Sequence, residues 1–373
     1  MSPEPLELRG PARATLEIDL AALTANWRML AARAAPAETA AVVKADAYGL
    51  GLEPVARALA RAGCRTFFVA RLEEGVALRG LLSDARIFVL DGIGRGEEED
   101  FVAHRLVPVL NQQAELEHWR RCARHRSRPL PAALHLDTGM TRLGFLPRAW
   151  EQLEAPDLEG LRLLLVMSHL ACADEPGHPL NARQLALFRS RARRFGEVPL
   201  SLAASSGIFL GREYHFDLCR PGVALYGVNP TPGAPNPMRP VVRLVAPLLQ
   251  VHDILEERSV GYGATFTAQP GMRIATVGVG YADGIPRAAS ARARARIAGR
   301  SVPYAGRVSM DLLALDVSAL PPELCRPGTE VELLGGADGI DALAAAADTI
   351  GYEILVRLGR RFRRVYRREG EAS

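Results

Sequence analysis

The length and composition of the chain indicate a globular protein of about two domains. It has 373 residues, 48% of them hydrophobic, and a net charge of +4. No stretch is long and apolar enough to predict a membrane span. The five cysteines form no CxxC pair, which argues against both a disulfide framework and a zinc site. Residues 1–5 lack the basic start and apolar run of a secretory signal, so we expect a cytoplasmic protein without a metal.

Arginines cluster in two places, and neither cluster predicts a nucleic-acid partner. Seven arginines lie between residues 357 and 368, and three alternate with alanine over residues 291–296. The alternation has the period of a β-strand, so all three arginines would share one face. Nucleic-acid binding would require a recognised binding module, and none is found. We interpret both clusters as solvated basic surfaces.

The first two-thirds of the chain alternate segments with the patterns of helices and of strands. Asp19 is expected to cap a helix that begins at Leu20. Short apolar runs typical of buried parallel strands follow, separated mostly by polar stretches of helical length such as residues 181–195. These runs span residues 40–44, 66–70, 86–90, 106–110, 132–137, 161–168 and 200–204. Seven or eight strand–helix units in about 230 residues predict a closed (β/α)₈ TIM barrel.

The pattern changes at a proline-rich stretch, residues 229–237, which predicts a linker. Beyond it, short β-like runs with glycine and proline turns predict a smaller, mostly β domain with a helix over residues 340–349. These runs span residues 241–252, 273–279, 296–297, 301–304, 312–317 and 330–334. We therefore expect a barrel over residues 1–236 and a β-rich C-terminal domain over residues 237–373.

The chain contains 45 arginines and a single lysine, Lys44. Lys44 follows an apolar run and falls at the carboxyl end of an early barrel strand, the face where such barrels keep their active sites. A primary amine can form a Schiff base with a carbonyl group, which a guanidinium cannot do. A leftover surface lysine is the alternative, and the position and uniqueness of Lys44 weigh against it. Aldolases also use a Schiff-base lysine, so Lys44 alone does not identify the reaction.

Four motifs resemble those of alanine racemases, which are fold-type III pyridoxal-phosphate enzymes. Residues 42–49, around Lys44, resemble the family's cofactor-lysine motif, and residues 137–144 resemble its second signature. Residues 280–284 and 306–311 resemble its C-terminal signatures. The match runs in order from about residue 14 to residue 366, nearly the whole chain. The resemblance implies pyridoxal 5'-phosphate as cofactor and the interconversion of L- and D-alanine for peptidoglycan synthesis.

The resemblance implies two bases, one on each face of the substrate Cα. Lys44 would hold the cofactor and then act as one base, and Tyr262 would act as the other. A free tyrosine has a pKa near ~10, so a cationic environment is needed to make it a base at neutral pH. In the family, His169 with its arginine neighbours supplies that environment. The family's tyrosine reaches into the partner's site, which implies a homodimer with Tyr262 contributed across the interface.

Arg220 matches the arginine that donates to the pyridine nitrogen of the cofactor in this family. An arginine stays protonated and can only donate, so it leaves that nitrogen unprotonated. A neutral ring is a weaker electron sink than a pyridinium, which disfavours side reactions such as transamination. Most other pyridoxal-phosphate folds place a carboxylate there.

The remaining implied roles concern the phosphate and the substrate. The phosphate would be bound by the hydroxyls of Tyr48, Ser205 and Tyr352 and by the backbone amides of Gly222 and Val223. Taken without the resemblance, Ser205 could simply belong to a strand-ending turn.

Three more residues are implied to contact the substrate. Arg142 would orient the substrate carboxylate or a neighbouring phenol, and Tyr281 and Met310 would narrow the entrance. Met310 taken alone would be assigned to core packing.

The chain departs from the family pattern at three positions. Many relatives carry a carbamylated lysine where this chain has His135, and with Lys44 the only lysine no such carbamate can form. Another acceptor, for which we suggest chloride, must then hold Arg142. Ala204 and Ser309 replace the usual asparagine and cysteine, which leaves substrate specificity open.

Other functions remain as alternatives. A racemase of serine or of another amino acid fits the same scaffold, because a pocket rejects an extra atom only weakly. Arg220 argues against a decarboxylase of the same barrel type. The residues from Val241 onward, with Tyr262, argue against a non-catalytic pyridoxal-phosphate-binding protein.

Overall fold

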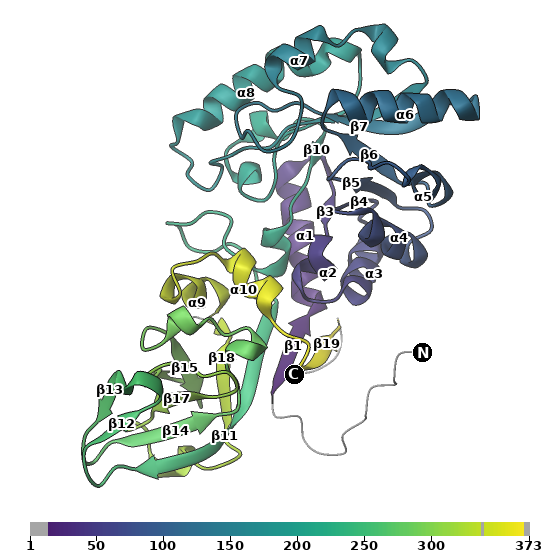
Figure 1. The fold of residues 1–373 in the computed structure, drawn as a ribbon. Helices are drawn as coiled ribbons and strands as arrows, with labels where there is room; N and C mark the ends of the chain where they lie inside the picture. Colours follow the sequence, from purple (N-terminus) through teal and green to yellow (C-terminus); the bar gives the residue numbers. More distant parts are fainter. Residues whose placement is uncertain (1–13, 337–338, 369–373) are drawn as a thin grey trace. The chain divides into compact units, whose positions relative to one another are not determined.

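The structure is a computed structural model that describes residues 14–336 and 339–368. The chain divides into two compact units, Leu20–Val241 and the combination of Met1–Asp19 with Val242–Ser373 (Figure 1). Residues 1–5, where the sequence predicts no secretory signal, lie outside the described residues. Within the described residues, no helix has the length and apolar character needed to cross a membrane, and no cluster of side chains could hold a metal ion.

Leu20–Val241 is a parallel β-barrel with helices around it (Figure 1). Seven parallel strands pair in sequence order, and β2 pairs with β10. They are β3 (Ala41–Val42), β4 (Thr66–Val69), β5 (Arg86–Val89), β6 (Val107–Leu110), β7 (Leu130–His135), β8 (Leu161–Met167) and β9 (Leu200–Ser201), with β2 (Glu38–Thr39) and β10 (Leu218–Cys219). β2 and β3 are successive parts of one extended segment, so the barrel has eight strand positions.

Backbone hydrogen bonds close this barrel. The Ala40 amide donates to the Cys219 carbonyl at 2.9 Å and the Val42 amide to the Pro221 carbonyl at 2.9 Å, joining the first strand to β10. On the other side of β10, the Arg220 amide donates to the Ala203 carbonyl at 2.9 Å. The (β/α)₈ barrel predicted from the alternation is therefore confirmed.

Hydrophobic patterning explains this unit. All four residues of β4 are buried, as a strand covered on both faces requires. Its Phe68 stacks on Phe88 of β5 with ring centroids 4.8 Å apart. The helices bury one face each; α3, for example, buries Val55, Ala58 and Leu59. The helices are α1 (Leu20–Ala34), α3 (Leu52–Ala62), α4 (Leu72–Leu81), α5 (Glu98–Ala103), α6 (Gln113–Arg126), α7 (Pro147–Gln152) and α8 (Pro179–Arg191).

The second unit is mostly β, as predicted. An eight-stranded sheet and a two-stranded hairpin form it, with two short helices. The sheet contains β1 (Thr15–Asp19), β11 (Val242–Asp253), β14 (Arg273–Val277), β15 (Arg294–Ile297), β16 (Arg300–Pro303), β17 (Leu313–Asp316), β18 (Glu330–Leu334) and β19 (Arg363–Arg367). The hairpin is β12 (Arg258–Val260) with β13 (Phe266–Ala268), and the helices are α9 (Ile340–Ala346) and α10 (Gly351–Arg357).

The first strand of the chain, β1, belongs to this second unit. β1 runs antiparallel to β11 and parallel to β19, and β11 in turn pairs with β18. The sequence placed the domain boundary after residue 236 and assigned residues 1–236 to the barrel. In the structure the barrel unit spans Leu20–Val241, and β1 is joined to strands more than two hundred residues later in the chain.

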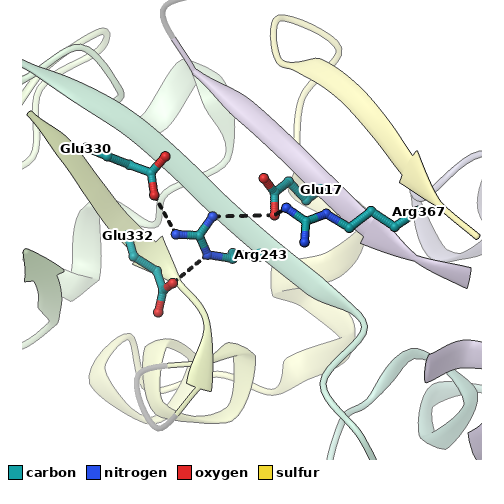
Figure 2. Close-up of polar contacts among 5 residues, drawn as sticks. All are labelled: Glu17, Arg243, Glu330, Glu332 and Arg367. Atoms are coloured by element: carbon teal, nitrogen blue, oxygen red, sulfur yellow. Dashed lines mark hydrogen bonds and ion pairs between the residues drawn. The ribbon is translucent and has the colours of Figure 1, made fainter. Parts of the chain in front are cut away.

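A network of ion pairs crosses the four strands β1, β11, β18 and β19 (Figure 2). Arg243 on β11 lies 2.5 Å from Glu330 and 2.6 Å from Glu332, both on β18. It also lies 3.4 Å from Glu17 on β1, which lies 2.8 Å from Arg367 on β19. One guanidinium therefore pairs with three carboxylates, and Glu17 extends the network to the last strand.

Candidate active site

Lys44 begins a left-handed turn directly after strand β3. The short element α2 (Lys44–Tyr48) has φ values of 53°, 54°, 54° and 56° at Ala45, Asp46, Ala47 and Tyr48. Each left-handed non-glycine residue costs about 1–2 kcal/mol. Four such residues in a row persist only where surrounding contacts hold them, and such strain concentrates at functional sites.

Local hydrogen bonds hold part of this turn. The Ala47 amide donates to the Val43 carbonyl at 3.0 Å, and the Gly49 amide donates to the Ala45 carbonyl at 2.7 Å. The Asp46 carboxylate accepts from the Leu52 amide at 2.7 Å, which fastens the turn to the start of α3. The turn therefore fixes the backbone from which the Lys44 side chain leaves.

The surroundings of Lys44 favour its neutral amine. The pKa of the Lys44 amine lies below its ordinary value. Burial is the main cause, and the positive charge of Arg142 is the second. Asp91 and Glu74 act in the opposite direction and raise it. A lowered pKa enlarges the fraction of unprotonated amine at pH 7, which is the form that attacks a carbonyl or removes a proton.

Arg220 is buried among the ends of β8, β9 and β10. Its guanidinium donates to the Ser168 carbonyl at 2.6 Å and also to the Ser201 hydroxyl. It lies over the ring of Phe68 at 5.9 Å from the centroid. Burial lowers the pKa of Arg220 to about 10, so the group stays protonated at pH 7. Among the residues that the structure describes, none accepts from its Nε–H.

His169 is a neutral side chain next to Arg220. Burial, followed by the charges of Arg220 and Arg142, lowers the pKa of His169 to about 3. An Arg220 N–H donates to His169 Nδ1 at 3.5 Å, a long hydrogen bond that makes Nδ1 the acceptor and places the proton on Nε2. The resemblance implied that His169 with its arginine neighbours supplies a cationic environment. In this structure the arginines carry that charge, and the histidine does not.

Gln184, a fully buried residue of α8, holds the backbone around His169. Its amide group donates to the His169 carbonyl at 2.9 Å and to the Thr138 hydroxyl at 3.1 Å, and it accepts from the Ala171 amide at 2.9 Å. Thr138 in turn lies 2.7 Å from the Ser168 hydroxyl. Sequence reasoning missed Gln184, because a glutamine inside an amphipathic helix gives no signal of the loop that it will contact.

The loop after β7 carries Arg142. The Asp137 carboxylate accepts from the amides of Gly139 at 2.8 Å, Met140 at 2.9 Å and Thr141 at 2.8 Å, which folds the loop around one side chain. No described residue accepts a hydrogen bond from the Arg142 guanidinium. The acceptor that the sequence analysis suggested for Arg142, chloride, therefore stays a prediction.

His135 lies at the end of β7, where the family pattern has a lysine. Its Nδ1 lies 2.9 Å from Asn111 Oδ1, while the Asn111 amide group donates to the carbonyls of Leu90 and Val109 at 3.1 and 2.8 Å. Because that oxygen can only accept, His135 Nδ1 must donate, which leaves Nε2 as an acceptor. Burial, then Arg220, lowers the pKa of His135 to about 4, so this residue is also neutral. Asn111 was missed by sequence reasoning, although a polar residue directly after the apolar β6 was a usable signal.

Tyr48, Ser205 and Gly222 meet at the mouth of the barrel. Ser205 Oγ accepts from the amides of Gly222 at 3.0 Å and Ala224 at 3.2 Å. A Cβ atom on Gly222 would lie 2.3 Å from the Tyr48 hydroxyl, so only glycine leaves that hydroxyl in place. The structure thus brings these three predicted residues together. Val223, whose amide was also predicted to bind the phosphate, lies in the sequence between Gly222 and Ala224, whose amides donate to Ser205.

Four predicted site residues belong to the β-rich unit. Tyr262 lies in a short 3₁₀ turn, Tyr262–Ala264, with its side chain 70% exposed. The Tyr281 and Ala282 amides donate to the carbonyls of Ser309 and Met310 at 3.0 and 2.9 Å, so the two predicted entrance residues are neighbours. Tyr352 lies in the first turn of α10 and is exposed.

Comparisons with known proteins agree along the whole chain. Residues 18–230 match the family described as alanine racemase, N-terminal domain, and residues 241–366 match alanine racemase, C-terminal domain. An alanine racemase of Rhodospirillum rubrum is 54% identical over 95% of this chain and 96% of its own length. A catabolic alanine racemase of Agrobacterium fabrum is 49% identical over 97% of this chain and 94% of its own.

Solved structures agree as well. The alanine racemase of Bartonella henselae, described with covalently bound pyridoxal phosphate, is similar with a TM-score of 0.91 and 38% identity, covering 95% of this chain and 100% of that one. The biosynthetic alanine racemase of Pseudomonas aeruginosa is similar with a TM-score of 0.89 and 37% identity, covering 96% of this chain and 100% of that one.

The barrel has a lysine at the end of its first strand and is accompanied by a β-rich unit. Together with these matches, that architecture defines an amino-acid racemase, which is an isomerase. The chain belongs to the alanine racemase family. The racemisation of alanine follows from that membership.

Proposed function

We propose that this enzyme interconverts L- and D-alanine with pyridoxal 5'-phosphate held by Lys44. The observation that carries the proposal is the buried Arg220, whose Nε–H lacks an acceptor among the described residues while its other groups are bonded to Ser168 and Ser201. That donor fits a ring nitrogen. The Ser205 and Tyr48 hydroxyls with the Val223 amide fit a phosphate, and Tyr352 is a further donor, while the Gly222 and Ala224 amides donate to Ser205 Oγ and hold it in place.

The cofactor, when bound, supplies an electron-withdrawing ring that makes the Cα proton of the amino acid acidic. The protein controls that proton from two sides. The Lys44 amine, with its lowered pKa, removes or returns the proton on one face. The Tyr262 hydroxyl does the same on the other face.

Arg220, His169 and Arg142 set the electrostatics of the reaction. Because a guanidinium donates hydrogen bonds and keeps its proton, Arg220 leaves the ring nitrogen neutral and limits side reactions. The neutral His169 ring carries its proton on Nε2, and this N–H can donate a hydrogen bond. The hydrogen bond that Nδ1 accepts from Arg220 orients the ring. Arg142 orients the substrate carboxylate, and Tyr281 with Met310 narrows the entrance.

Absorbance and product analysis test the cofactor and the reaction together. The purified protein is expected to absorb near the visible edge, and borohydride should fix the cofactor covalently on Lys44. D-alanine should form from L-alanine, and L-serine serves as the competing substrate. Faster conversion of serine than of alanine would favour the alternative substrate. A protein that shows no absorbance band after addition of pyridoxal phosphate would contradict the proposal.

The working enzyme is proposed to be a homodimer in which each Tyr262 completes the partner's site. Mixing Lys44→Ala with Tyr262→Phe, each inactive alone, tests this arrangement. In a hybrid dimer one site carries both defects and the other carries none. Random mixing should therefore restore about a quarter of the activity. Absence of recovery, with dimers present by sedimentation, would place both residues in one subunit.

The product D-alanine is proposed to supply peptidoglycan synthesis in a bacterial cytoplasm. The similar proteins include a biosynthetic and a catabolic racemase, so the cellular role needs its own test. Expression of the chain should rescue growth of a D-alanine auxotroph, and expression of Lys44→Ala should not. Growth that still requires D-alanine, with active enzyme in the extract, would exclude a biosynthetic role.

A further inference from the structure

One carboxylate, that of Glu74, joins the ends of two neighbouring barrel strands. Glu74 is the third residue of α4. Its Oε1 accepts from the Ala45 amide at 2.6 Å. Its Oε2 accepts from the Ala70 amide at 2.8 Å and from the Arg71 amide at 3.3 Å. Ala45 follows Lys44, and Ala70 follows β4, so this side chain continues the link between β3 and β4.

The link begins where the backbone ladder between these strands ends. The Val43 amide donates to the Phe68 carbonyl at 2.9 Å. Beyond Val43 the chain enters the left-handed turn, and its next amides no longer face β4 as an extended strand would. Glu74 binds the first amide of that turn, Ala45, with an ionised acceptor, which makes a stronger hydrogen bond than a neutral one.

We propose that Glu74 is a positioning residue for Lys44, because its bridging carboxylate fixes the left-handed turn from which the amine extends. The inference rests on the proposed role of Lys44. Glu74 would act through Lys44 and would not touch substrate or cofactor.

Several charged groups face the Lys44 amine. Arg142, in the loop after β7, lowers its pKa after burial, whereas Asp91, which follows β5, and Glu74 raise it. His169, after β8, is close enough for the two groups to influence each other but is neutral at pH 7. Among these groups, Glu74 is the only one whose carboxylate also binds the amide next to Lys44.

The single lysine makes a direct test possible. In cofactor-free protein grown with lysine labelled at ¹³Cε and ¹⁵Nζ, Lys44 gives one side-chain signal, and its titration reports the amine pKa without any catalytic assay. Glu74→Gln removes the charge and one of the two acceptors. Glu74→Asp keeps the charge but is one methylene too short to span both amides. Glu73→Gln, at the exposed neighbour on the same helix, is the matched control.

Glu74→Gln is expected to lower the Lys44 pKa, and Glu73→Gln should leave it unchanged. Both Glu74→Gln and Glu74→Asp are expected to lose about tenfold or more in kcat with a smaller change in KM, because displacement of the reacting group affects the transition state. Asp91→Asn should lower the pKa while leaving kcat closer to wild type, since Asp91 does not bind the turn.

An unchanged Lys44 pKa in a folded Glu74→Gln protein would overturn the proposal. Equal kcat losses in Glu73→Gln and Glu74→Gln would do the same. Because the titration uses cofactor-free protein, its result is separate from the proposed function. A protein that binds no pyridoxal phosphate would refute the proposed function and leave the pKa comparison intact. If Glu74→Gln does not fold, Glu74→Asp supplies the same kcat comparison.

Discussion

Replacement of Gly222 by alanine tests the phosphate site with the smallest available change. A Cβ added at Gly222 would lie 2.3 Å from the Tyr48 hydroxyl, 3.1 Å from its Cζ and 3.3 Å from Val42 Cβ. The φ of Gly222 is −124°, outside the left-handed region, so the effect arises from the space that the methyl group takes. Tyr48 packs against Tyr226 with ring centroids 4.6 Å apart and ring planes tilted by 31°, and its ring must move for the methyl group to fit.

The expected result is weaker cofactor binding by a protein that still folds. If the displaced Tyr48 hydroxyl is one donor to the phosphate, its loss removes a hydrogen bond to a charged group, about 1.5–3 kcal/mol. The dissociation constant for pyridoxal phosphate should then rise about tenfold to a hundredfold. Fluorescence titration of the cofactor-free protein measures it. Gly80→Ala, a helical position with no atom within 4 Å of the added Cβ, is the control.

A double-mutant cycle separates the steric cause from others. Tyr48→Phe removes the hydroxyl directly and should weaken cofactor binding by a similar factor. Because the phenylalanine ring lacks the oxygen that the new methyl group meets, Gly222→Ala added to Tyr48→Phe should have little further effect. Additive losses, or wild-type affinity in Gly222→Ala, would refute the placement of Tyr48 and Gly222 at the phosphate.

Three further predictions concern polar and charged groups away from the phosphate site. Gln184→Leu removes the side-chain partner of the His169 carbonyl and of the Ala171 amide. It should lower the free energy of unfolding by about 1–3 kcal/mol and kcat by about tenfold. Unchanged kinetics would show that Gln184 does not support His169. Arg243→Met leaves Glu17, Glu330 and Glu332 without their shared cation and should cost about 1–3 kcal/mol in urea unfolding at pH 7. A loss of the same size in high salt would contradict the electrostatic explanation. In the folded protein the pKa values of His135 and His169 are lowered from 6.5 to about 4 and about 3. Unfolding near pH 5 should therefore take up about two protons. The free energy of unfolding should decrease as the pH falls from about 6.5 to 4. His135→Asn and His169→Asn should each reduce that uptake by about one proton, as measured by urea unfolding at several pH values.

The barrel could be predicted from sequence because its strands are local apolar runs, and each pairs with the next run along the chain. β4, β5 and β6 all appear in the sequence as short buried segments. The place of β1 could not be predicted in this way. Its alternating burial marks a half-covered strand, but nothing local shows that its partners are β11 and β19. Pairings between distant segments depend on the complete sheet.

The roles of the site residues stay predictions, and the geometry around them could not be predicted from the sequence. Lys44 was found by its uniqueness and position, and Arg220 by resemblance. The left-handed turn was not foreseeable, because the sequence from Ala45 to Tyr48 contains no glycine and favours an ordinary helix. Its φ values are imposed by contacts such as the Asp46 carboxylate with the Leu52 amide. The same holds for Asn111 and Gln184, whose importance depends on where the neighbouring loops lie.

The charge distribution of the barrel site links its composition to the proposed chemistry. Arg220 keeps its positive charge at pH 7, and the two buried histidines are held neutral beside it. Neither His135 nor His169 therefore changes charge between pH 5 and 8, where free histidines titrate. The pKa of the Lys44 amine is lowered by its burial and by the charge of Arg142. Under the proposed mechanism, replacing either histidine should change the rate of racemisation without moving the limbs of its pH profile.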